Sequence, residues 1–200
     1  MSNDLTKICR CPWLDNSKPD YVAYHDNEWG IPVYDDKRFF EFLILESAQA
    51  GLSWYTILKR RNGYQEAFSN FEVQKVATYN QEKVESLMLN TSIIRNRGKI
   101  NAAINNAKLF IRIQQEFGSF SDYIWGFVNN KVIVNEYCEL SDYPATSNES
   151  DLLSKDLKKH GFKFIGSTIC YAYMQACGLV NDHSLGCYKR KQIIAQYQQS

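Results

Sequence analysis

The sequence has no long hydrophobic run, no internal repeat and no low-complexity tract. No apolar stretch approaches the length of about 20 residues that spans a bilayer, and residues 1–7 lack the apolar core of a secretion signal. These absences predict a cytoplasmic protein with no membrane partner. In that reducing compartment, we expect the six cysteines to be free thiols or metal ligands rather than disulfides.

Net charge is also nearly absent, because 23 Lys and Arg residues oppose 22 Asp and Glu residues. Any contact with nucleic acid must therefore come from local basic patches rather than from a field over the whole molecule. The 200 residues are enough for one packed core, and 44% of them are hydrophobic. We expect a single domain over residues 1–200, acting as a monomer.

Strand patterns are scarce, and residues 131–134 form the only strand-like segment. Elsewhere the apolar residues recur at spacings of three and four, which is typical of helices. Asp35 and Ser53 stand where helix N-caps are expected, and Asn62-Gly63 where a helix is expected to end. The sequence therefore predicts an all-α protein. Its helices are expected over about residues 36–50, 54–62, 81–89, 99–117, 123–128, 148–160 and 167–177.

Four side chains of metal-ligand type lie near the two ends of the chain. Cys11 and His25 lie near the start, while His183 and Cys187 are one helical turn apart near the end. Zinc accepts two thiolates and two imidazoles in a tetrahedral site, so one ion would join the two ends. Ordinary core or surface residues without a metal remain the alternative. A catalytic zinc would keep a position open for water, which four protein ligands argue against.

One acidic residue interrupts an apolar helix face. Glu46 lies among apolar residues at helical spacing, and burial of a carboxylate is costly unless the group is paired. It therefore either faces a pocket or makes a structural hydrogen bond in the core. Aromatic residues near the first two candidate ligands offer a stacking wall for a flat base, although most aromatics belong to a core. These aromatics are Trp13, Tyr21, Tyr24 and Trp29.

A glycine-flanked loop at residues 161–166 separates the last two predicted helices and has lysines around it. Glycine permits close approach of the backbone, and the free N–H groups of the following helix can bind phosphate. This pattern is typical of a helix-hairpin-helix DNA-binding segment, here over about residues 148–177. An ordinary α-hairpin with a solvated lysine face has the same pattern. The basic turn at residues 94–99 offers either a further phosphate contact or a solvated helix cap.

Together these segments resemble the 3-methyladenine DNA glycosylase I family, from about Arg10 to Cys187. The stretch before residue 20 is about one residue longer than that family leads us to expect, and the tail after Cys187 lacks the extra cysteines of some relatives. The matching segments are residues 10–13 (RCPW), 23–30 (AYHDNEWG), 45–46 (LE), 50–54 (AGLSW), 93–100 (IIRNRGKI), 161–166 (GFKFIG), 169–171 (ICY) and 174–183 (MQACGLVNDH).

The resemblance implies a helix-hairpin-helix DNA repair glycosylase. Such an enzyme flips the damaged nucleotide out of double-stranded alkylated DNA and hydrolyses its glycosidic bond. It releases free 3-methyladenine and leaves an abasic site. A monofunctional enzyme is expected, because no lysine matches a pocket position where a Schiff base would form. A DNA-binding module without catalysis and a zinc hydrolase remain as the other classes.

The resemblance also assigns roles to residues of this sequence. The implied catalytic residue is Glu46. The implied base-contacting residues are Trp13, Tyr21, Tyr24 and Trp54. The implied DNA-contacting residues are Gly51, Leu52, Gly161, Lys163 and Gly166. The implied ligands of one structural Zn2+ per chain are Cys11, His25, His183 and Cys187.

Overall fold

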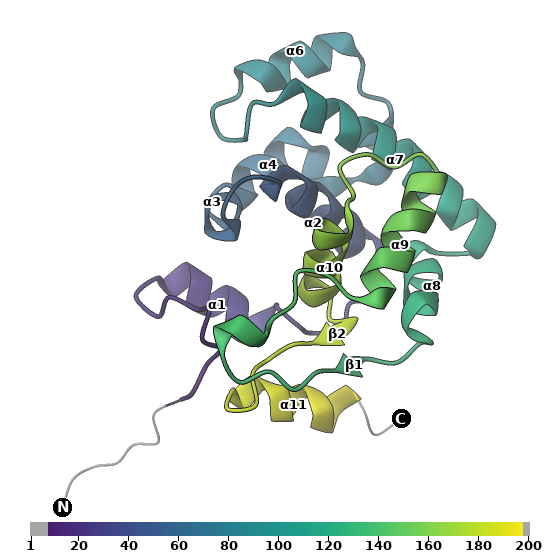
Figure 1. Ribbon diagram of the computed structural model, residues 1–200. Helices are drawn as coiled ribbons and strands as arrows, with labels where there is room; N and C mark the ends of the chain where they lie inside the picture. Colours follow the sequence, from purple (N-terminus) through teal and green to yellow (C-terminus); the bar gives the residue numbers. More distant parts are fainter. Residues whose placement is uncertain (1–7, 198–200) are drawn as a thin grey trace, which may run out of the picture.

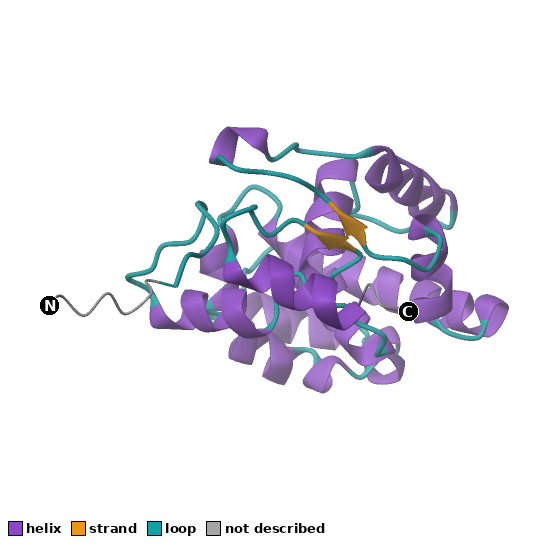
Figure 2. Cartoon of the chain, turned by 90° about the horizontal axis from the view of Figure 1, so that it is seen from below, coloured by secondary structure: helices purple, strands orange, loops and turns teal. Residues whose placement is uncertain are grey.

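The computed structural model describes residues 8–197, and helices dominate it (Figures 1 and 2). Two short strands, β1 (Ile133–Val134) and β2 (Val180–Asn181), form a parallel pair. The prediction of an all-α protein is therefore confirmed in that the described residues are mostly helical, with this short strand pair besides. The α-helices are α1 (Pro19–Asn27), α2 (Asp36–Gln49), α3 (Trp54–Leu58), α4 (Arg61–Ala67), α5 (Val73–Ala77), α6 (Gln81–Leu89), α7 (Arg97–Phe117), α8 (Phe120–Trp125), α9 (Asn148–Lys159), α10 (Ser167–Ala176) and α11 (Tyr188–Tyr197). The 3-10 turns are η1 (Ser69–Phe71), η2 (Gly126–Val128) and η3 (Leu140–Asp142).

Residues 1–7, on which the expectation about a secretion signal rests, lie outside the described residues. Between residues 8 and 197, none of the helices combines the length and apolar composition that a membrane span requires.

Local capping explains why the main helices begin where the sequence predicts. The side chain of Asp35 accepts a hydrogen bond from Lys37 N at the start of α2, and that of Asn96 accepts one from Lys99 N at the start of α7. A side-chain oxygen at this position satisfies an N–H group that has no partner inside the helix.

The predicted helix end at Asn62-Gly63 is wrong. Helix α3 already ends at Leu58, and α4 runs through both residues. A Cβ atom at Gly63 would lie 2.6 Å from the carbonyl oxygen of Ser92. Glycine at this position therefore permits close packing of α4 against the loop that follows α6, and it does not terminate a helix.

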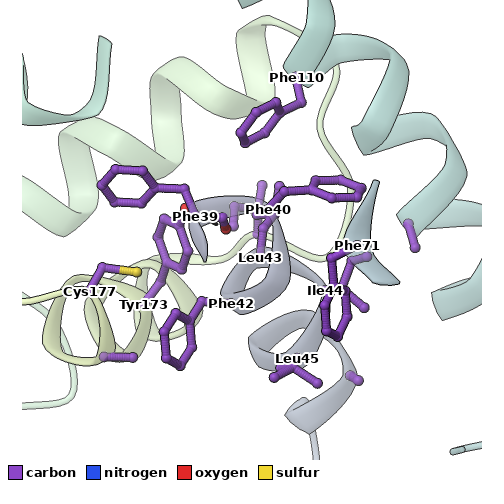
Figure 3. Close-up of a cluster of buried hydrophobic side chains, with 14 of the residues drawn as sticks. Phe39, Phe40, Phe42, Leu43, Ile44, Leu45, Phe71, Phe110, Tyr173 and Cys177 are labelled. Atoms are coloured by element: carbon purple, nitrogen blue, oxygen red, sulfur yellow. Dashed lines mark hydrogen bonds between the residues drawn. The ribbon is translucent and has the colours of Figure 1, made fainter. Parts of the chain in front are cut away.

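Helix α2 forms the centre of the core. Its residues 39–48 are all buried, which is the expected state of a helix that is apolar around most of its circumference. Figure 3 shows the aromatic side chains of α2 surrounded by residues of α7 and α10. The hydroxyl group of Tyr173 on α10 donates to the carbonyl oxygen of Phe39 at 2.9 Å. Because α2 is fixed on all sides, its side chains have well-defined positions.

The two ends of the described chain meet at one end of the molecule (Figure 1). Backbone hydrogen bonds join Gly30 N to Gln175 O, Val33 N to Cys177 O and Tyr188 N to Cys9 O. The chain on either side of α1 is thus attached to the C-terminal end of α10 and to the start of α11. This attachment brings residues more than 140 positions apart in sequence into contact.

Candidate active site

A cavity of about 260 Å³ lies beside the C-terminal half of α2. Its walls come from the N-terminal segment, α1, α2, the start of α3, the segment around η3, and α10. The cavity brings together six residues that the sequence analysis selected: Trp13, Tyr21, Tyr24, Trp29, Glu46 and Trp54.

Glu46 is a buried acid without a partner. Its side chain is 4% exposed, and among residues 8–197 it makes no hydrogen bond or ion pair. Burial raises the pKa of its carboxyl group to about 8, because a low-dielectric surrounding disfavours the charged form. A carboxyl group in this state, facing a cavity, is a strong candidate for a functional residue.

A second buried acid on the same helix shows the contrast. Glu41 accepts hydrogen bonds from Arg38 at 2.6 Å and from Arg61 at 2.7 Å. Two arginines therefore compensate its charge, whereas nothing does so for Glu46. Lack of a partner, more than burial itself, distinguishes Glu46.

Aromatic rings form most of the cavity wall. The ring centroids of Trp13 and Tyr21 are 5.3 Å apart, and those of Tyr24 and Trp54 are 5.2 Å apart. Burial, and then the nearby charge of Glu46, raises the pKa of Tyr21 to about 12. Both effects keep the phenol neutral near pH 7. The wall is therefore aromatic, neutral and closely packed.

Three hydrogen-bond donors in the wall are buried without an acceptor among the described residues. They are the indole Nε1 groups of Trp13 and Trp54 and the hydroxyl group of Tyr143. Buried polar groups are normally paired, so an unpaired set around one cavity requires an explanation. With the carboxyl group of Glu46, these donors suit a flat ligand that carries both acceptors and donors.

The predicted DNA-contacting turn lies directly beside this cavity. Gly51 and Leu52 connect α2, which carries Glu46, to α3, which begins with Trp54. Gly51 has a φ angle of +80°, and no atom lies within 4 Å of where its Cβ would be. The side chain of Leu52 is 40% exposed. The turn is thus exposed to any partner that approaches the cavity.

The loop between α9 and α10 turns its carbonyl groups inward. Four of its carbonyl oxygens accept hydrogen bonds from side chains of α7, α2 and α9. These bonds run from Asn105 Nδ2 to Gly161 O (3.0 Å), from Asn106 Nδ2 to Lys163 O (2.9 Å), from Ser47 Oγ to Phe164 O (3.2 Å) and from Ser154 Oγ to Ile165 O (2.8 Å).

The N–H groups at the end of this loop and in the first turn of α10 have no such partners among residues 8–197. Within the described part of the chain, the backbone N–H groups of residues 164–169 have no acceptor, and Gly166 supplies no side-chain cap to α10. Lys163 is exposed beside them. Free N–H groups at a helix N-terminus, with a cation nearby, are suited to bind a phosphate group.

The four candidate metal ligands are all buried and form one cluster. One ligand atom from each of them lies within 4.8 Å of the others. The sulfur of Cys11 is 3.3 Å from His183 Nδ1, and the sulfur of Cys187 is 3.6 Å from His25 Nε2. In a tetrahedral zinc site with usual bond lengths, sulfur and nitrogen ligands are separated by about 3.6 Å. The cluster therefore has the composition and size of a zinc site.

Outer hydrogen bonds orient both imidazole rings of this cluster. His25 Nδ1 lies 2.8 Å from Asp26 Oδ1, and His183 Nε2 lies 3.0 Å from the carbonyl oxygen of Trp29. If each of these nitrogens carries the proton, the other nitrogen presents a lone pair to the cluster. Metal-binding histidines are commonly oriented in this way. Arg10 holds Asp26 in place at 2.8 Å.

Several cavity residues were not among the sequence-based candidates. Gln49 lies one turn after Glu46 on α2, and this spacing could have identified it. No comparable signal marks Tyr143 or Gln175, which reach the cavity from a loop and a helix far away in sequence. The further lining residues outside the predicted set are Leu140, Pro144 and Ala172.

Comparison with known proteins reveals close relatives. The family model described as Methyladenine glycosylase matches residues 13–191. The DNA-3-methyladenine glycosylase 1 of Escherichia coli (strain K12) is 51% identical over 178 residues, which cover 89% of this chain and 95% of that protein.

Solved structures agree in fold. A crystal structure of 3-methyladenine DNA glycosylase I has a TM-score of 0.87 at 48% identity and covers 90% of this chain and 98% of that chain. A variant of 3-methyladenine DNA glycosylase I in complex with 3-methyladenine has the same TM-score at 39% identity, covering 90% of this chain and 97% of that chain.

Proposed function

We propose that this protein excises 3-methyladenine from alkylated DNA, and the premise is that the chain belongs to the methyladenine glycosylase family. The observation that carries the proposal is the cavity, in which the buried carboxyl group of Glu46 lies among aromatic rings and has no partner among residues 8–197. A flat, cationic purine complements each part of this cavity.

The chemistry begins with a damaged nucleotide that is already prone to leave. Alkylation at N3 gives the purine a positive charge, so the base departs neutral when the glycosidic bond breaks. Flipping the nucleotide out of the duplex gives it access to the cavity. Water then adds to the sugar carbon, the bonding electron pair moves to the base, and the proton released by water passes to solvent. An abasic site and free 3-methyladenine result.

Glu46 recognises the charged base in this proposal. The positive charge of the bound base favours the ionised form of Glu46, and the carboxylate then accepts hydrogen bonds from the adenine amine and offsets the charge of the ring. Stacking against Trp13, Tyr21, Tyr24 and Trp54 favours the electron-poor ring. No lysine lines the cavity among the described residues, which supports hydrolysis without a Schiff base.

We assign a structural role to one zinc ion held by the four clustered side chains. All four are buried, and four protein ligands leave no position for a reacting water. When bound, zinc would fasten the segment before α1 to the segment between β2 and α11. The same segment before α1 carries Trp13, so the metal would also stabilise one wall of the cavity. A site closed by four protein ligands therefore argues against a zinc hydrolase.

The remaining surface features form a DNA-binding face in this proposal. The Gly51–Leu52 turn would enter the gap that the flipped nucleotide leaves. The α9–α10 segment, about residues 148–177, would act as a helix-hairpin-helix and bind backbone phosphate through Gly161, Lys163 and Gly166. We propose that the whole chain acts as one domain and as a monomer on double-stranded DNA in the cytoplasm.

Replacing Gly166 with Leu is expected to weaken DNA binding by about 1.5–3 kcal/mol, because charge-assisted hydrogen bonds to the loop N–H groups would be lost. The fold should tolerate the change, since no atom lies within 4 Å of a Cβ there. Fluorescence anisotropy with a duplex that contains an abasic-site analogue measures the effect. Gly126→Leu is the control, because its Cβ also meets open space. Equal DNA affinity of the two variants would make the hairpin purely structural.

Replacing Trp54 with Ala is expected to weaken binding of free 3-methyladenine by about 1–3 kcal/mol, the usual contribution of base stacking on an aromatic side chain. Isothermal titration calorimetry gives the affinity without relying on tryptophan fluorescence. Tyr34→Ala is the control, because Tyr34 is 60% exposed and stacks on Trp125, neither of which lines the cavity. An unchanged affinity in the Trp54 variant would assign Trp54 to the core.

A duplex with a single 3-methyladenine tests the function itself. Incubation with the protein should produce an abasic site that alkali cleaves at that position. A duplex with adenine at the same position should stay intact, and cleavage of both, or of neither, would exclude the proposal.

A further inference from the structure

A lysine from a distant helix holds the C-terminal end of α2. The ammonium group of Lys99, in the first turn of α7, donates to the carbonyl oxygen of Ala48 at 2.7 Å and to that of Ala50 at 2.6 Å. The last carbonyl groups of a helix have no partner within the helix. A cation at this end also interacts favourably with the helix dipole.

The other cations of the basic turn are arranged differently. Arg97 is exposed and pairs with Glu85 at 2.6 Å, and Arg95 is exposed. Lys99 is half-buried, and burial lowers the pKa of its ammonium group. Its donors point into the protein, so the expected phosphate contact of this turn does not extend to Lys99.

The segment that Lys99 holds separates two residues of the cavity. Residues 50–53 connect Glu46, one turn upstream, to Trp54, which begins α3. Among residues 8–197, no other side chain from outside residues 36–58 hydrogen-bonds to residues 48–53. Gly51 has no neighbouring atoms where a Cβ would be. The position of this turn therefore depends on local bonds and on Lys99.

We infer that Lys99 is a positioning residue for base excision, which sets the Gly51–Leu52 turn and, through it, the relative placement of Glu46 and Trp54. This inference rests on the proposed excision of 3-methyladenine. Lys99 does not touch the base. By holding the end of α2, it keeps Glu46 at the cavity and the Gly51–Leu52 turn in position to face the DNA.

Replacing Lys99 with Met keeps most of the side-chain length and removes the two hydrogen bonds. We expect single-turnover excision to slow on the order of 10- to 100-fold, because displacement of a positioned group by about 1 Å can have an effect of this size. The measurement uses saturating enzyme on a duplex with one 3-methyladenine, at a temperature far below thermal unfolding. A 2-aminopurine beside an abasic-site analogue reports insertion of the turn, and its fluorescence change should shrink in Lys99→Met.

Lys75→Met is the matched control, because it removes the same charge from an exposed lysine whose side chain makes no hydrogen bond or ion pair within residues 8–197. Its excision rate should stay within about threefold of wild type, since an exposed surface charge contributes little. Lys99→Arg should recover most of the rate, because a guanidinium group can donate to both carbonyl groups.

The outcomes separate the possible roles of Lys99. A lower melting temperature with unchanged excision and unchanged 2-aminopurine response would make Lys99 merely structural and overturn the inference. If Lys99→Met and Arg97→Met, a second variant in the basic turn, slow excision equally and change the salt dependence of DNA binding equally, Lys99 would be assigned to phosphate binding. This result would also overturn the inference. Absence of excision by the wild-type protein would instead refute the proposed function.

Discussion

Replacing Glu46 with Gln should slow single-turnover release of 3-methyladenine on the order of 100-fold or more, the effect typical of removing one preorganised electrostatic group from a buried site. Gln keeps the shape of the side chain and an acceptor oxygen, but not the charge. The substitution therefore isolates the attraction between the carboxylate and the cationic base. Chemical quench on the same methylated duplex gives the two rates.

The Glu46 variant should remain folded, with normal DNA binding and metal content. It should also lose part of the pH dependence of stability. The folded protein keeps the Glu46 proton up to about pH 8, whereas the ordinary carboxyl group releases it near pH 4.5. Stability from this group is therefore greatest below pH 4.5 and is lost as the pH rises to about 8. Denaturant unfolding across this range should give a flatter profile for Glu46→Gln. Equal excision rates for the two proteins would make Glu46 a structural acid.

Removal of one zinc ligand should have the largest effect on stability. We expect His183→Ala to lower the free energy of unfolding by about 4 kcal/mol or more, because loss of a structural metal ranks among the few very large single-residue effects. Metal binding of this kind is coupled to folding, so chelation should lower the melting temperature of the wild-type protein as well. Elemental analysis should find one zinc per chain in the wild type.

His160 offers a control for this experiment. It lies outside the metal cluster and faces Asp156 at 3.4 Å, so His160→Ala should keep both zinc and stability. In the proposed role the zinc ion takes no part in the reaction, so the folded fraction of His183→Ala should keep most of the wild-type excision rate. Purified wild-type protein without zinc, or a His183 variant as stable as the His160 variant, would contradict the structural metal.

Local rules predict the main helices of this fold. The caps at Asp35 and Ser53 follow from side-chain chemistry close in sequence, and both occur in the structure. The helix end expected at Asn62-Gly63 does not occur in the structure. Gly63 is needed instead for close contact with Ser92, and local sequence patterns do not predict such a long-range contact. Helix α1 begins with Pro19 at its N-terminus, and no strong apolar spacing marks it. Tertiary contacts stabilise such short helices more than their own sequence does.

The candidate site was only partly predictable for the same reason. Glu46 stands out in the sequence because it interrupts an apolar helix face. Burial alone nevertheless does not identify Glu46 as a site residue, since Glu41 on the same helix is buried as well. The distinction between the two acids depends on arginines supplied by the fold. Tyr143 belongs to a loop without periodicity, and its approach to the cavity depends on long-range packing. Lys99 carries a charge that suggests phosphate, yet its partners lie on another helix.

In the proposed function, this cavity selects one damaged base and releases it from DNA. The most direct measurement is chromatography of the bases released when the protein acts on DNA treated with a methylating agent. We expect 3-methyladenine to accumulate with wild-type protein and far more slowly with Glu46→Gln, while undamaged adenine stays in the DNA. Release of no 3-methyladenine, or release at equal rates by the two proteins, would contradict this proposal.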